Sequence, residues 1–134
     1  YVLSFEEIMC MLEGKDIKFA EMSGDTAYER DASKLGLSFP LTAGVSAAVQ
    51  DTVAAMGGEV HNAQYCSGLD KCRDTVKAAA EGKLDCSYIE GMACPNGCID
   101  GPDTVGDFHI TKVALTKYAA AAPNKQVAED KHTK

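Results

Sequence analysis

The most specific stretch of the chain is residues 88–102, YIEGMACPNGCIDGP. An apolar run leads there into a loop in which three residues separate Cys94 from Cys98. Pro95 fixes its own φ angle and Gly97 permits a backbone conformation that a side chain would block, so both thiols can converge on one object. Thiolates presented in this way suit a soft metal centre, and adjacent glycines let backbone N–H groups approach cluster sulfurs. A disulfide, or two unrelated buried thiols, is the alternative interpretation.

Residues 88–101 resemble the third signature of the iron-only (FeFe) hydrogenase large subunit. In that signature an aromatic residue and a glutamate precede Met-Ala-Cys-Pro-Gly-Gly-Cys and a glycine-rich run. The resemblance implies that Cys94 ligates a 4Fe-4S cluster and that Cys98 bridges this cluster to a two-iron subsite bearing CO and cyanide. Met92 would lie against the two-iron subsite. Glu90 matches the acidic position of the signature, without an assigned chemical step.

The chain departs from this signature in two places. Asn96 stands where the family has its first glycine, and residues 100–103, DGPD, replace a run of glycines followed by Gln-Pro. These differences bear on turnover more than on cluster binding. The resemblance therefore implies an oxidoreductase that reversibly reduces protons to H2, with an iron-sulfur sensory or structural protein without fast turnover as the alternative. A third interpretation is a structural domain in which Cys94 and Cys98 form a disulfide or bind zinc.

The resemblance also implies that other parts of a longer protein complete the site. The two upstream signatures of the family, each with a further cluster cysteine, and the cysteine thought to pass protons are not found in the sequence. The chain starts at Tyr1 rather than at a methionine. We therefore expect the later half of a hydrogenase catalytic domain, metal-free and inactive by itself. Its expected partners are the N-terminal part of the parent chain and a redox partner such as ferredoxin or a signalling module.

Size and charge narrow the class of protein. With 134 residues, of which 46% are hydrophobic, the chain has the size of one globular domain. Its net charge of -7 and scattered basic residues argue against nucleic-acid binding, and no segment reads as membrane-spanning. We expect the domain to cover residues 1–123 and a solvated tail to cover 124–134, where charges of both signs alternate. An adequate core makes disulfides unnecessary, which favours reduced thiols in a cytoplasmic or anaerobic setting.

Periodicity predicts an α/β fold, a three-layer-like arrangement with a small, mostly parallel sheet and flanking helices. Ser4 and Glu7 form a capping box that begins a helix ending at Gly14, after a strand end at residues 1–3. Further helices are expected from 42 to 56, where residues 45, 48, 49, 53 and 56 form one face, and from 108 to 122. Strand, helix and strand over 59–66, 69–81 and 84–89 predict a parallel βαβ unit. The signature loop then leaves the carboxyl end of a strand, where open α/β sheets bind ligands.

The helix over 69–81 is expected to bury Leu69, Cys72, Val76 and Ala79 or Ala80. Buried packing is also the interpretation for Cys72 in mid-helix, for Cys86 in mid-strand and for Cys10 on the first helix. Cys66 ends a strand, and a four-cysteine cluster that includes it is the alternative.

The histidines show no spacing typical of metal ligands, either with one another or with an acidic partner. His61, His109 and His132 are therefore interpreted as ordinary surface or hydrogen-bonded residues.

Overall fold

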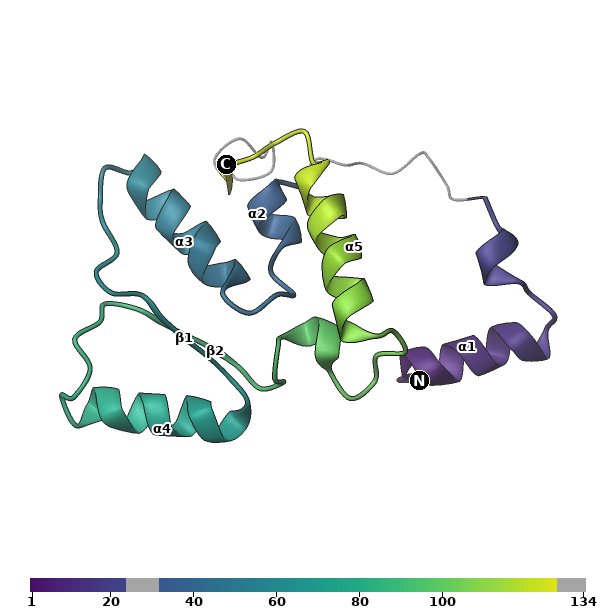
Figure 1. The fold of residues 1–134 in the computed structure, drawn as a ribbon, viewed down its shortest axis with the longest axis horizontal. Coiled ribbons are helices and arrows are strands. Elements are labelled where there is room, and N and C mark those ends of the chain that lie inside the picture. The colour runs from purple at the N-terminus through teal and green to yellow at the C-terminus, as the bar shows by residue number, and fades with distance from the viewer. Residues whose placement is uncertain (24–31, 128–134) are drawn as a thin grey trace.

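The computed structural model of the protein describes residues 1–23 and 32–127. In chain order the elements are helix α1 (Phe5–Gly14), the 3-10 helix η1 (Phe19–Glu21), helices α2 (Lys34–Leu37) and α3 (Gly44–Ala55), strand β1 (Gln64–Ser67), helix α4 (Leu69–Ala80), strand β2 (Ile89–Met92), the 3-10 helix η2 (Cys98–Asp100) and helix α5 (Phe108–Ala120). Figure 1 shows the strands between α3 and α4, with α2 lying between α3 and α5. The predicted α/β fold with flanking helices is confirmed.

The centre of the fold is the predicted parallel βαβ unit. β1 pairs with β2 in parallel, and the register places Cys66 beside Gly91 and Ser67 beside Met92. Helix α4 forms the crossover between the two strands. The second strand begins later than expected, at Ile89 rather than at 84, so residues 89–92 of the signature are themselves strand. The loop with the two cysteines therefore follows the carboxyl end of β2, as predicted.

The two-stranded ribbon separates two layers of helices. Helix α4 packs against both strands, whereas α3 contacts β2 and is joined through α2 to α5 (Figure 1). The buried residues are mostly small: Ala48 of α3, Cys66 of β1, Ile99 of η2 and Ala119 of α5. Small side chains allow the backbones of neighbouring elements to approach closely, because they leave little volume between them.

Local capping explains where the first and last helices begin. The Ser4 hydroxyl accepts the N–H of Glu7 at 3.2 Å, and the Glu7 carboxylate accepts the N–H of Ser4 at 2.8 Å. The predicted capping box of α1 is thus confirmed. Asp107 caps α5 by accepting the N–H groups of His109 and Ile110. The strand expected at residues 1–3 is wrong, since no other described strand lies beside them for pairing and they are exposed.

Two predictions of burial on α4 are wrong, and one residue of the expected apolar face of α3 is exposed. Leu69 is 72% exposed and Val76 is 57% exposed, because α4 faces the ribbon with its smaller residues, including Cys72 and Ala79. Met56 is 82% exposed, because α3 ends at Ala55 and Met56 is its C-cap. Each of these side chains fits the apolar period of its helix, but a ribbon of two strands is too narrow to cover the whole face.

The region after α5 returns to the body of the fold. The Asn124 carbonyl accepts the N–H of Lys34 at 2.8 Å, and the Asp51 carboxylate accepts the N–H of Val127 at 3.4 Å. The ammonium of Lys125 donates to the carbonyl of Ala122. Of the predicted tail, residues 128–134 lie outside the described residues, as does His132; residues 24–31 of the long connection before α2 do so as well.

Candidate functional site

The signature loop is a tight turn built on two left-handed residues. Asn96 has φ 64° and Gly97 has φ 94°, and the Gly97 N–H donates to the Cys94 carbonyl at 3.2 Å. The chain then enters η2 at Cys98. The Asn96 side chain donates to the Asp100 carboxylate at 2.8 Å and so links the two ends of the turn. The turn places both predicted ligand cysteines on one short structural unit.

A segment far upstream holds this turn in place. The Cys98 N–H donates to the Pro40 carbonyl at 2.8 Å, and Gly97 forms an antiparallel bridge with Leu41. A Cβ atom on Gly97 would overlap the Pro40 carbonyl oxygen and would lie 2.9 Å from the Thr42 nitrogen. Glycine is therefore required here both by its φ angle and by the close approach of residues 40–42.

The thiols of Cys94 and Cys98 differ in exposure. Cys94 is half-buried, and a Cβ atom on Gly101 would lie 3.6 Å from its sulfur, while Cys98 is exposed. Both are free thiols. Thiol donors on a glycine-lined turn are the right chemistry for an iron-sulfur cluster, which normally takes four cysteine ligands. Among residues 1–23 and 32–127 no group of three or more His, Cys, Asp or Glu side chains is arranged to hold a metal ion, and the turn itself supplies two thiol donors.

Glu90, the acidic residue of the signature, anchors β2 to α3. Glu90 is only 5% exposed, and its two carboxylate oxygens accept the N–H of Ala43 at 3.0 Å and the N–H of Ser46 at 2.6 Å. These N–H groups belong to the start of α3, where the helix dipole favours a negative charge. These two hydrogen bonds offset the cost of burying the carboxylate. They also join β2, which precedes Cys94, to α3, which follows Pro40.

Met92 is the last residue of β2 and is half-buried. Its carbonyl accepts the N–H of Gly68 at 2.9 Å, so its position is set by the end of β1.

At the start of α3, the hydroxyl of Thr42 is buried without a hydrogen-bond partner in the part of the chain that the structure describes, as is the hydroxyl of Ser46. Thr42 belongs to the segment 40–42 that lies against the turn, whereas Ser46 lies within α3.

The remaining cysteines lie elsewhere. Cys66 and Cys72 contact one another beside β2. Cys72 occupies the first turn of α4 rather than its middle. Cys86 was expected in mid-strand but precedes β2, which starts only at Ile89. Cys10 was expected to be buried but is exposed, because α1 lies to the side of the main body of the fold (Figure 1).

His61 is exposed and has a hydrogen-bond partner, which agrees with its interpretation as an ordinary surface or hydrogen-bonded residue. Its Nε2 atom lies 3.1 Å from the Asp85 carboxylate. Both side chains are well exposed, so this hydrogen bond is a surface contact that contributes little to stability. Asp85 is distant in sequence, which is why spacing alone did not reveal the pair.

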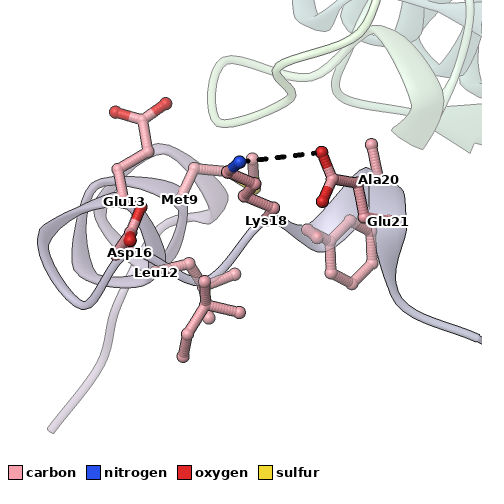
Figure 2. Close-up of a pocket in the computed structure, with 9 residues that line it drawn as sticks. Met9, Leu12, Glu13, Asp16, Lys18, Ala20 and Glu21 are labelled. Carbon is pink, nitrogen blue, oxygen red and sulfur yellow. Dashed lines mark ion pairs between the residues drawn. The ribbon is translucent and has the colours of Figure 1, made fainter.

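A separate hollow of about 440 Å³ lies between α1 and η1 and is lined by residues between Met9 and Glu21. Figure 2 shows its labelled side chains, with the ion pair of Lys18 and Glu21 at 3.8 Å. None of the signature residues lines this hollow.

Among the described residues, no helix is both long and apolar enough to span a bilayer.

Comparison with known proteins identifies the family of the chain. A stretch of 71 residues is 34% identical to the cytosolic Fe-S cluster assembly factor NAR1 of Scheffersomyces stipitis; the alignment covers 48% of this chain but only 12% of that protein. Residues 1–102 match the C-terminal domain of the iron-only hydrogenase large subunit. Since this match covers most of the 134 residues, the chain belongs to the family of C-terminal domains of the iron-only hydrogenase large subunit.

Proposed function

We propose that Cys94 and Cys98 hold one side of an iron-sulfur cluster in the intact protein, and that this cluster serves the reversible reduction of protons to H2. The observation that carries the proposal is the turn itself: two free thiols on one stiff loop, fixed to residues 40–41 at the carboxyl end of a parallel strand. Such an edge is where α/β sheets bind their ligands. When bound, the cluster would supply electron transfer.

The chain supplies two of the ligands that a 4Fe-4S cluster needs. Further cysteines, in the N-terminal part of the parent protein, would supply the others. A redox protein such as ferredoxin would deliver the electrons. The matched stretch of NAR1 is likewise a small share of a longer protein, which its name describes as a cytosolic Fe-S cluster assembly factor.

The residues around the turn have distinct roles in this proposal. Cys94 and Cys98 bind the cluster, with Cys98 as its link to a two-iron subsite, and Met92 shields that subsite from water. Glu90 is a positioning residue, because its bonds to Ala43 and Ser46 hold β2 against α3. Cys98 is exposed, so a further segment of the parent protein could approach it.

The second candidate is a role in iron-sulfur cluster assembly without H2 turnover, as in the name of NAR1. One feature of the turn favours it. Asn96 replaces the first glycine of the signature, and its side chain occupies the turn through the bond to Asp100. A filled turn leaves less room for a two-iron subsite than a bare glycine would.

Iron and acid-labile sulfide in anaerobically prepared intact protein test the ligand set. We expect both contents to fall by at least about half in Cys94→Ser and in Cys98→Ser, because each variant removes one thiolate of the cluster. Cys10→Ser, which removes an exposed thiol outside the turn, is the matched control and should retain full iron. Unchanged iron in both turn variants would overturn the proposal.

Two further measurements separate the candidate functions. Infrared bands of CO and cyanide, together with H2 evolution from a reduced viologen, support proton reduction. Iron-sulfur content without either signal supports the assembly role. The 134-residue chain alone should bind iron only substoichiometrically after reconstitution, and a stoichiometric cluster on it would contradict a site shared with other segments.

A further inference from the structure

A second pair of cysteines lies in direct contact beside β2. The sulfur of Cys66 is 3.4 Å from the sulfur of Cys72. Cys66 is in β1 and Cys72 is in the first turn of α4, so only the tight connection through Gly68 separates them. No part of the family signature includes either residue.

The surroundings of the pair hold both sulfurs in place. The Cys72 thiol donates to the Met92 carbonyl at 3.3 Å, and the Cys66 thiol donates to the Glu90 carbonyl at 3.5 Å. Between these carbonyls lies Gly91, where a Cβ atom would come within 3.4 Å of the Cys72 sulfur. Because Gly91 has no side chain, the sulfurs of Cys66 and Cys72 can both lie against the backbone of β2 at this position.

The pair is close to solvent although Cys66 itself is only 8% exposed. Cys72 is half-buried, and Cys66 lines a hollow of about 430 Å³ together with polar residues that include Lys71, Asp74 and Thr75. This hollow leaves room for a small polar reagent beside Cys66, and Cys72 is itself partly exposed. Two thiols that touch one another and are accessible in this way can react, whereas cysteines buried in a core are inert.

We propose that Cys66 and Cys72 form a reversible disulfide by exchange with a low-molecular-weight disulfide such as oxidised glutathione. The thiolate of Cys72, the more exposed residue, attacks one sulfur of the reagent and displaces one glutathione thiolate, which leaves a mixed disulfide on Cys72. The thiolate of Cys66 then attacks the Cys72 sulfur and displaces the second glutathione thiolate. Two protein thiols are oxidised, the reagent is reduced to two thiols, and the two protons pass to solvent or to the released thiolates.

Disulfide formation would act on the strand that precedes the signature turn. Both thiols lose their hydrogens, so the carbonyls of Glu90 and Met92 lose the S–H donors that now contact them. The new bond would also fasten the start of α4 to β1. The inference goes beyond the proposed iron-sulfur function and does not depend on it, because the disulfide can form whether or not Cys94 and Cys98 bind iron.

Peptide mapping of the whole 134-residue chain tests the proposal. Reduced protein is equilibrated anaerobically with mixtures of reduced and oxidised glutathione, quenched with acid, alkylated with N-ethylmaleimide and digested with trypsin. Cleavage after Lys71 puts Cys66 and Cys72 on separate peptides, whereas residues 86, 94 and 98 share the peptide 84–112. We expect a linked species of the peptide 35–71 with the one that begins at Cys72. It should accumulate as the oxidised fraction rises and disappear with dithiothreitol.

Matched variants make the assignment specific. Cys86→Ser should retain the linked species, and Cys72→Ala should lose it and leave Cys66 alkylated or glutathionylated. Separate, fully alkylated peptides of the wild-type chain at every glutathione ratio would overturn the proposal, and so would linkage of either residue only to the peptide 84–112. Because the wild-type result is decisive without any variant, a variant that fails to fold does not weaken the test.

Discussion

The carboxylate of Glu90 accepts the backbone N–H of Ser46 across 2.6 Å, so a strand residue of the signature caps a helix that begins 46 positions earlier in the chain. The bond lies within the protein, since Ser46 is 1% exposed and Glu90 is 5% exposed. The bond joins β2, which leads into the cysteine turn, to α3, which follows the residues 40–41 that hold this turn. Four predictions concern the contacts of this region.

Replacing Glu90 by alanine should lower the free energy of unfolding by about 2–3 kcal/mol, because two N–H groups lose a charged acceptor in a buried place. Urea denaturation followed by circular dichroism measures the change. Glu59→Ala removes an exposed carboxylate and should change stability by less than about 0.5 kcal/mol. Equal effects of the two substitutions would show that the cap of α3 contributes nothing.

Gly97→Ala should destabilise the fold by more than about 2 kcal/mol, because the added Cβ atom suffers both the strain of positive φ and overlap with the Pro40 carbonyl. Gly57→Ala separates these causes: Gly57 also has positive φ, but a Cβ atom there meets nothing within 4 Å. The control should cost about 1–2 kcal/mol from strain alone. The difference between the two unfolding free energies measures the clash, and its absence would contradict the close approach.

Asn96→Ala should lower stability by about 1 kcal/mol, since alanine tolerates the left-handed region less well than asparagine. Asn96→Gly, which restores the residue of the family signature, should stay within about 0.5 kcal/mol of wild type, because glycine adopts this φ without strain. Asp100→Ala removes only the side-chain bond to Asn96 and serves as the control. Thermal melting ranks the three variants; a strongly stabilised Asn96→Ala would refute the strain argument.

The alkylation rate of Cys72 should depend on Cys66. The hydrogen bond with the Cys66 thiol, followed by partial burial and the nearby Cys66 charge, raises the pKa of the Cys72 thiol. A raised pKa means less thiolate at a given pH, so Cys72 should react slowly with iodoacetamide at about pH 8 and faster as the pH increases. Cys66→Ala removes the first of these causes and should speed the reaction several-fold at that pH. Cys86→Ala should leave the rate unchanged, and equal rates in both variants would contradict the coupling.

Local patterns predicted most of the fold. The capping box of Ser4 and Glu7 lies within one turn, and the βαβ unit follows from short segments of clear period, so neither needs knowledge of distant partners. Burial was harder, because Leu69 and Val76 fit the period of α4 and yet lie beyond the edge of a ribbon of two strands. Whether a face is covered depends on what lies opposite, which a single segment does not specify.

The candidate turn was predicted from its own residues, but its anchors were not. The bonds of Cys98 to Pro40 and of Glu90 to Ser46 connect positions more than forty residues apart. One sequence signal could have indicated the second bond, since an acidic residue inside an apolar strand must find partners when it is buried. The contact of Cys66 with Cys72 was likewise missed, because Cys66 was considered as the end of a strand and Cys72 as a packed residue of a helix, although only six positions divide them.

Because the turn is bonded to residues 40–41, the number of residues between Pro40 and α3 affects the position of the Cys98 thiol. Inserting or deleting one residue between Ser38 and Ala43 would shift the Pro40 carbonyl relative to the start of α3 and would carry Cys98 with it, although the motif itself stays intact. Two chains of this family with identical cysteine motifs could therefore present their sulfurs differently, according to the length of a stretch that contains no cysteine.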